Sequence, residues 1–359
     1  MKDRDVLIYL HSLFLNEDYL DSILELENLD DILVMEEEDL IQFGNNKKSI
    51  SKIIESRNKD YINNLVENIN KNAVQVITIL DEDYPVDLQL IERPPKVIYV
   101  KGNKLNLDNI RIGVVGARKC TPYGKYVVEK FVSELANLNT TIISGMAQGI
   151  DAHAHKIALD NETYSIGVLG TGVDLKFPGM NSKLYERMYK EGTIISEYPL
   201  GTRALPFYFP ERNRIISGLS HGVIVAEGKE KSGSLITARF AAEQGKEVFV
   251  APGNINSIYS VGTNKLIRDG ATPLLEIEDI TTAIPGFLEA KINEQVSIED
   301  SLSENEKLIL EKIDSGLSTI DLILENVDLD IKEVSSLVTL LEMKGIISNM
   351  GVSGFQRNI

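Results

Sequence analysis

Glycine, hydroxyl and basic side chains recur in several short segments of this sequence, a combination typical of phosphate binding. The segments are Gly116 with Arg118, Ser144-Gly145 with Gly149, Phe209 with Arg212-Asn213-Arg214, and Ser232-Gly233-Ser234 with Thr237. Glycine lets a backbone approach a ligand closely, hydroxyl and N–H groups donate to phosphate oxygens, and arginine binds them bidentately. Arg203 and Lys265 are further cations of this set. We therefore expect a site for a ligand with several phosphates.

These segments follow short apolar runs that we expect to form buried parallel strands. The predicted strands cover residues 110–115, 141–144, 165–169, 222–226 and 246–250. A predicted helix begins at Arg212, and another covers residues 235–244. Open α/β sheets bind ligands at the carboxyl ends of their strands, so the segments should meet in one crevice. The predicted fold class is α/β.

Catalysis has weaker support than binding. Glu197 and Glu227 follow strands in the same crevice, where they either act as general acid and base or orient the nearby arginines. The G-x-S-x-G match at residues 218–222 precedes a predicted strand instead of following one, so it is not a nucleophile elbow, and the sequence has no Walker A loop. His153 and His155 lie two residues apart on a predicted helix and do not share a face, so a metal pair is not expected. We expect no catalytic residue, no metal and no cofactor; a nucleotide-processing hydrolase is the alternative.

The net charge of −17 is unevenly distributed. Residues 1–75 hold 16 acidic and 8 basic residues, and residues 300–359 hold 11 and 5, whereas residues 110–285 hold 18 and 19. A polyanion is therefore expected to meet the middle of the chain. There Arg203 precedes the aromatic cluster Phe207-Tyr-Phe209, which favours a single strand whose bases stack while its backbone meets cations, with Phe209 nearest the site.

The domain organisation follows from composition and periodicity. We expect a small helical domain over residues 1–75, the α/β domain over 76–285, a polar linker over 286–302, and helices with winged-helix spacing over 303–359. The third of these last helices is acidic, which favours protein contact over reading of duplex DNA and weakens a winged-helix regulator as a third hypothesis. A single cysteine and the lack of an apolar run near 20 residues suit a cytoplasmic protein with no membrane span.

Five ordered motifs make the chain resemble the DprA/Smf family of DNA-processing proteins. They are Gly116-Ala-Arg118, Ser144-Gly-Met-Ala-Gln-Gly-Ile-Asp151, Phe209-Pro-Glu-Arg-Asn-Arg-Ile-Ile-Ser-Gly-Leu-Ser220, Ser232-Gly-Ser-Leu-Ile-Thr-Ala238 and Ala251-Pro-Gly253. The resemblance implies an extended Rossmann-like core that binds single-stranded DNA and loads the RecA recombinase onto it, in natural transformation and homologous recombination. It also implies a homodimer, an N-terminal domain of the sterile-alpha-motif type and a C-terminal winged helix.

The resemblance also assigns individual residues. Arg118 matches the arginine of the family's G-S-R turn and is expected on a DNA phosphate, although Ala117 replaces the usual serine. Pro206 stands where some members carry a lysine, and we expect Arg203 to compensate for that cation. The sequence thus predicts a non-enzymatic, single-stranded-DNA-binding recombination mediator.

Overall fold

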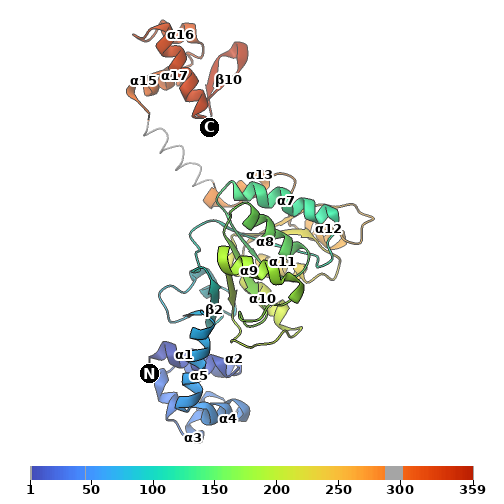
Figure 1. The fold of residues 1–359 in the computed structure, drawn as a ribbon. Helices are drawn as coiled ribbons and strands as arrows, with labels where there is room; N and C mark the ends of the chain where they lie inside the picture. Colours follow the sequence, from blue (N-terminus) through green and yellow to red (C-terminus); the bar gives the residue numbers. More distant parts are fainter. Residues whose placement is uncertain (1, 45, 288–301, 359) are drawn as a thin grey trace. The chain divides into compact units, whose positions relative to one another are not determined.

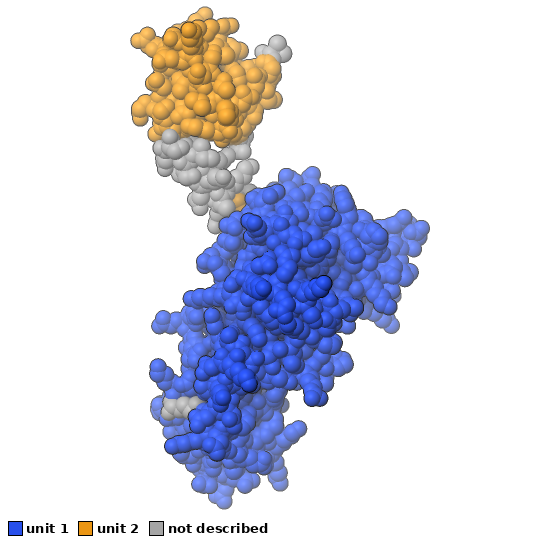
Figure 2. All heavy atoms as spheres, in the orientation of Figure 1, with its two compact units in different colours: residues 1–284 blue, residues 285–359 orange. Residues whose placement is uncertain are grey.

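A computed structural model describes the chain except for residues 1, 45, 288–301 and 359, so the predicted linker lies almost entirely outside the described residues. The described chain forms two compact units, residues 1–284 and 285–359 (Figure 2).

The first unit is built on a sheet that has nine strands in the described part of the chain. The strands are β1 (Gln75–Thr78), β2 (Val97–Gly102), β3 (Arg111–Gly116), β4 (Thr141–Ser144), β5 (Ser165–Leu169), β6 (Thr193–Ser196), β7 (Gly222–Glu227), β8 (Glu247–Val250) and β9 (Thr272–Pro273). Their order is β1-β2-β6-β5-β4-β3-β7-β8-β9. The pairs β1–β2 and β2–β6 are antiparallel, and all other pairs are parallel. The predicted α/β, Rossmann-like core is confirmed, with its five predicted strands placed to within one residue.

Helices cover both faces of this sheet (Figure 1). They are α6 (Val86–Gln89), α7 (Pro122–Ala136), α8 (Ile150–Asp160), α9 (Ser182–Glu191), α10 (Tyr208–Leu219), α11 (Ser234–Glu243), α12 (Val261–Arg268) and α13 (Glu278–Thr281), with the 3-10 turn η3 (Gly179–Asn181). Right-handed crossovers place α7 to α9 on one face and α11 on the other, because the chain moves along the sheet in opposite directions after β3 and after β7. α10 packs beside α11, where Ile215, Ile216 and Ala238 share a core with Val223 and Val225 of β7.

The reversal of direction between β3 and β7 creates the point where such sheets bind ligands. The two strands are hydrogen-bonded neighbours, with Gly116 opposite Glu227 after a register shift. Just beyond them, the Ala117 N–H donates to the Glu227 carbonyl over 2.8 Å. The loops that follow β3 and β7 are thereby held side by side, which is where the sequence predicts the site.

The N-terminal segment is helical, as predicted. Its elements are α1 (Asp3–Ser12), α2 (Glu17–Leu24), η1 (Leu29–Leu33), α3 (Glu37–Leu40), η2 (Ile41–Phe43), α4 (Lys47–Ser56) and α5 (Lys59–Lys71). These helices belong to the same compact unit as the sheet and contact its β1–β2 edge (Figure 1). Arg4 forms an ion pair with Asp81 at 2.9 Å, and His11 Nδ1 lies 3.3 Å from the Tyr99 hydroxyl. The boundary at residue 75 stays a prediction.

The second unit contains α15 (Glu304–Asp314), α16 (Ile320–Leu324), α17 (Ile331–Met343), β10 (Ile347–Asn349), η4 (Gly351–Ser353) and β11 (Phe355–Arg357). Capping boxes begin α15 at Ser303 and α17 at Asp330, and β10 and β11 form an antiparallel pair. Three helices followed by a hairpin is the predicted order of elements; the assignment as a winged helix stays a prediction.

Candidate functional site

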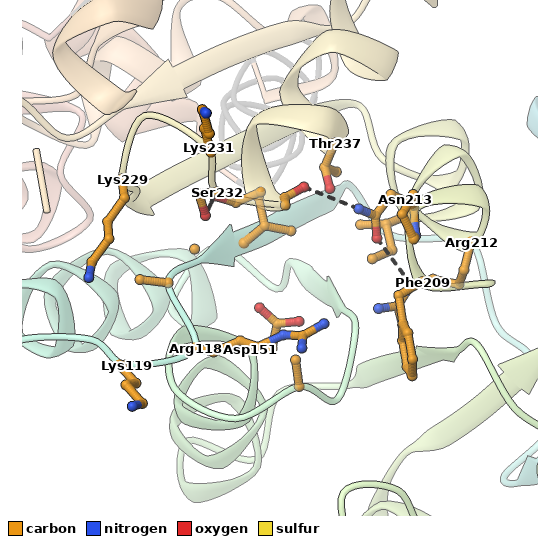
Figure 3. Close-up of a pocket in the computed structure, with 18 of the residues that line it drawn as sticks. Arg118, Lys119, Asp151, Phe209, Arg212, Asn213, Lys229, Lys231, Ser232 and Thr237 are labelled. Atoms are coloured by element: carbon orange, nitrogen blue, oxygen red, sulfur yellow. Dashed lines mark hydrogen bonds between the residues drawn. The ribbon is translucent and has the colours of Figure 1, made fainter. Parts of the chain in front are cut away.

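A pocket of about 470 Å³ lies at the carboxyl ends of β3 and β7 (Figure 3). It is lined by the loops after β3, β4 and β7, by the first turns of α10 and by the start of α11. Nine residues of the predicted site line it: Gly116, Arg118, Phe209, Arg212, Asn213, Ser232, Gly233, Ser234 and Thr237. The structure therefore brings together segments that are more than 100 residues apart in sequence.

Four exposed basic side chains, which we call the pocket cations, line this pocket: Arg118 and Lys119 after β3, and Lys229 and Lys231 after β7. Among the described residues, no carboxylate lies within ion-pair distance of any of them. Unpaired like charges gathered in one concave site repel one another and attract a polyanion. Only Arg118 of these four was in the predicted site; the lysines were missed although they stand in the same loops.

The start of α11 adds hydrogen-bond donors to the pocket. Ser232 Oγ and Ser234 Oγ lie 2.8 Å apart, and Asn213 Nδ2 of α10 donates to the Gly233 carbonyl over 3.3 Å. Thr237 follows one turn later and is buried. The N–H groups of Leu235 and Ile236 donate to the carbonyls of Ser232 and Gly233 over 3.1 Å, so this helix start offers an anion the serine hydroxyls and the positive end of the helix dipole. This arrangement suits a phosphate group at the lysine-bearing side of the pocket.

An aromatic wall closes the opposite side. In Figure 3, Lys119, Lys229 and Lys231 lie on one side of the pocket and Phe209 on the other, with Arg118 and Asp151 between them. The Arg118 guanidinium carbon lies 5.6 Å from the centre of the Phe209 ring, within the range of a cation–π contact. Phe209 lines the pocket, as expected from the sequence.

Arg212 has a structural role that the sequence did not reveal. Its side chain is buried, and its Nη1 donates to the carbonyl of Gly145 over 2.8 Å and also to that of Val168. A Cβ on Gly145 would lie 2.4 Å from Arg212 Nη2 and 2.7 Å from Asp151 Oδ2, so only glycine fits between these two groups. Burial raises the pKa of Asp151, and the positive charge of Arg212 opposes that shift. Arg212 thus holds the turn after β4 in place.

Arg214 is a correction to the predicted phosphate ligands. The predicted helix start at Arg212 is wrong, because α10 begins at Tyr208 and tolerates Pro210 in its first turn. Arg214 therefore lies in the helix body, where its Nη1 and Nη2 donate to the two carboxylate oxygens of Glu197 over 2.9 and 2.6 Å. Both side chains are buried. Arg214 is held by a carboxylate rather than free for a phosphate.

The second candidate carboxylate is also engaged. Glu227 accepts hydrogen bonds from Thr121 N over 2.8 Å and from Thr121 Oγ1 over 2.7 Å, at the residue that caps α7. Its side chain is 2% exposed. Since Glu197 and Glu227 both serve buried structural contacts, the hydrolase alternative loses the two groups on which it depended.

The other predicted residues lie beside the pocket or away from it. Ser144 is fully buried and its Oγ donates to the Val114 carbonyl over 2.6 Å, so its hydroxyl is not available as predicted. Gly149 has φ +83°, and a Cβ there would lie 2.3 Å from the Ala117 oxygen. It permits close packing rather than ligand binding. Arg203 and Lys265 are exposed but do not line the pocket.

Among the described residues, no group of three or more His, Cys, Asp or Glu side chains is placed to hold a metal ion. His155 is fully buried, with its Nδ1 2.7 Å from Ser165 Oγ. Burial lowers the pKa of His155 to about 3, so this imidazole is neutral at physiological pH. No helix in the described part of the chain is long and apolar enough to span a bilayer.

Comparison with known proteins identifies the family. The model of the family described as DNA recombination-mediator protein A matches residues 75–285. DNA processing protein DprA of Bacillus subtilis is 43% identical over 216 residues, which are 60% of this chain and 73% of that protein.

Two solved structures are also similar. The crystal structure of DNA processing protein A from Streptococcus pneumoniae matches with a TM-score of 0.70 and 34% identity over 79% of this chain and 99% of that one. A structure of the Helicobacter pylori protein, described as having a unique single-stranded DNA binding mode, matches with a TM-score of 0.54 and 30% identity over 60% and 96%. Sequence and fold agree: this chain belongs to the DNA recombination-mediator protein A family.

Proposed function

We propose that this protein binds single-stranded DNA in the pocket at the ends of β3 and β7. The observation that carries the proposal is the convergence of four pocket cations, none within ion-pair distance of a carboxylate, with Arg118 beside Phe209 and the three lysines on the opposite side. Phosphates would lie on the pocket cations and at the start of α11, and a base would stack at Phe209. Asp151, the acidic residue of the lining, is buried; Arg212 is its main charge partner, and it attracts Arg118 more weakly.

A single strand fits this site better than a duplex. Stacking on Phe209 requires a base whose face is free, whereas a duplex buries base faces within its own stack. The similarity to the Helicobacter pylori protein, whose single-stranded DNA binding mode has been described, supports the same choice. We include in the proposal that the protein acts without catalysis of its own, since Glu197 and Glu227 are engaged elsewhere.

The biological role is the wider part of the proposal and rests on family membership. A DNA recombination-mediator would hold the strand, protect it from nucleases and load the RecA recombinase onto it, in natural transformation and in homologous recombination. It would do so in the cytoplasm as a homodimer, with residues 1–75 and 303–359 as flanking domains for protein contacts. Light scattering at several protein concentrations tests the dimer. Loading is tested by the rate at which recombinase filaments form on single-stranded DNA, measured with and without this protein.

The decisive experiment is a fluorescence-anisotropy titration of the full chain with a labelled oligothymidylate and a duplex of the same length. We expect tight binding of the single strand, weaker binding of the duplex, and a loss of affinity in Arg118→Ala. Equal binding of both probes, or an unchanged affinity in the variant, would refute the proposed site. Turnover of a mononucleotide by the unaltered protein would instead support the alternative function, a nucleotide-processing hydrolase.

A further inference from the structure

A second aromatic ring, that of Phe177, continues the wall that Phe209 begins. The two ring centres lie 5.6 Å apart, and their planes are inclined by 31°. Phe177 is 45% exposed, whereas Phe209 is half-buried. We propose that Phe177 is a base-stacking residue, which receives a nucleobase of the bound strand just outside the pocket. The assignment rests on the proposed single-stranded DNA binding and extends it beyond the pocket.

The backbone around Phe177 is held in place by contacts with neighbouring elements. The Phe177 carbonyl accepts a hydrogen bond from the Tyr185 hydroxyl over 2.7 Å. Asn181 Nδ2 donates to the Met146 carbonyl over 2.9 Å, beside Ala147, which lines the pocket. A ring held on a fixed backbone loses little conformational entropy when a base stacks on it. The segment is thus preorganised for contact with a planar ligand.

The layout of charge gives the strand a direction. In Figure 3, Lys229 and Lys119 lie on one side of the pocket and Arg118 lies between them and Phe209, so phosphates bound by these cations would lead towards Phe209. The next nucleotide beyond Phe209 reaches the ring packed against it, which is Phe177. Phe177 keeps a surface that a base can reach, because 45% of the residue is exposed although its ring packs against Phe209.

The chain contains no tryptophan, which provides a direct test. Phe177→Trp introduces a single indole, whose fluorescence reports stacking of a base. Phe14→Trp is the matched control, because Phe14 is 46% exposed and lies on the N-terminal helical segment. We expect oligothymidylate to quench the fluorescence of Phe177→Trp and not that of the control. An abasic oligonucleotide of the same length should quench neither variant.

Affinity gives the second readout. Phe177→Ala should weaken oligothymidylate binding by about fivefold to tenfold, leave binding of the abasic probe unchanged, and differ from an unaffected Phe14→Ala. Two results would overturn the assignment, provided that the unaltered protein binds oligothymidylate. One is an equal loss of affinity for both probes in Phe177→Ala. The other is no loss of affinity together with no quenching in Phe177→Trp. If the unaltered protein does not bind oligothymidylate at all, the proposed function fails and this inference fails with it.

Discussion

The pocket cations predict a specific dependence of DNA binding on salt. Each phosphate that a protein neutralises on a single strand contributes about −0.7 to the slope of log affinity against log salt, because condensed counterions are released. The pocket has four exposed cations without carboxylate partners among the described residues, Arg118, Lys119, Lys229 and Lys231. We therefore expect a slope of about −2.8, which is a loss of about 50-fold in affinity between about 50 and 200 mM salt.

Removal of one of these cations should change the slope by a fixed amount. In Arg118→Ala the slope should become shallower, about −2.1, so that the same increase in salt weakens binding only about 20-fold. Lys265→Ala and Arg203→Ala are matched controls, because both residues are exposed cations outside the pocket. The assay is anisotropy of a labelled oligothymidylate over a salt series. A slope near zero, or an equal change in Lys265→Ala and Arg118→Ala, would refute the assignment of phosphates to this pocket.

Three further predictions concern the scaffold of the site. Glu197→Ala leaves a buried guanidinium without its carboxylate and should lower the free energy of unfolding by about 3–5 kcal/mol in urea denaturation, and a loss below about 1 kcal/mol would contradict a buried pair. Gly149→Ala places a Cβ 2.3 Å from a backbone oxygen of the β3–α7 loop and should destabilise more than Gly201→Ala, which has a similar positive φ but no atom within 4 Å; equal losses would mean that strain alone matters. The pKa of His155 is about 3 in the folded protein, against an ordinary value of 6.5. As the pH falls, the unfolded chain therefore takes up this proton before the folded protein does. Stability should therefore fall as pH decreases from about 6.5 towards 3, by at most about 1.4 kcal/mol per pH unit from this group. His155→Gln should flatten the pH dependence of urea midpoints between pH 6.5 and 5, and an unchanged dependence would argue against a neutral buried imidazole.

The positions of the parallel strands were predictable because their signal is local. Thr141–Ser144 and Ser165–Leu169 are short apolar runs followed by glycine, a pattern that holds for strands buried on both faces. Arg118 was predictable for a related reason, because a residue that directly follows such a strand lies at the sheet's binding edge. The same reasoning applied to Lys229 and Lys231 would have found two of the missed pocket cations.

The fate of the other arginines was not predictable in this way. Arg212 and Arg214 lie two residues apart on one helix and look equivalent in the sequence. Arg212 meets the carbonyls of the β4 and β5 ends, and Arg214 meets Glu197, which follows β6. Each partner is supplied by another strand, and no local pattern encodes those distances.

The sequence by itself thus predicted the order of elements and the edge of the sheet at which the candidate site lies, and it indicated a ligand with several phosphates. Hydrophobic periodicity and glycine placement depend only on near neighbours along the chain, so they can be read directly. Only the tertiary structure decided which polar groups face the pocket and which form hydrogen bonds or ion pairs inside the protein. Ser144, Arg214 and Glu227 carry the same chemistry as ligand-binding residues, yet burial forces each to find a partner inside the protein. The pocket cations keep their charge available to a ligand because no carboxylate in the described chain lies within ion-pair distance of them; Arg118 and Lys229 instead lie against the rings of Phe209 and Tyr259.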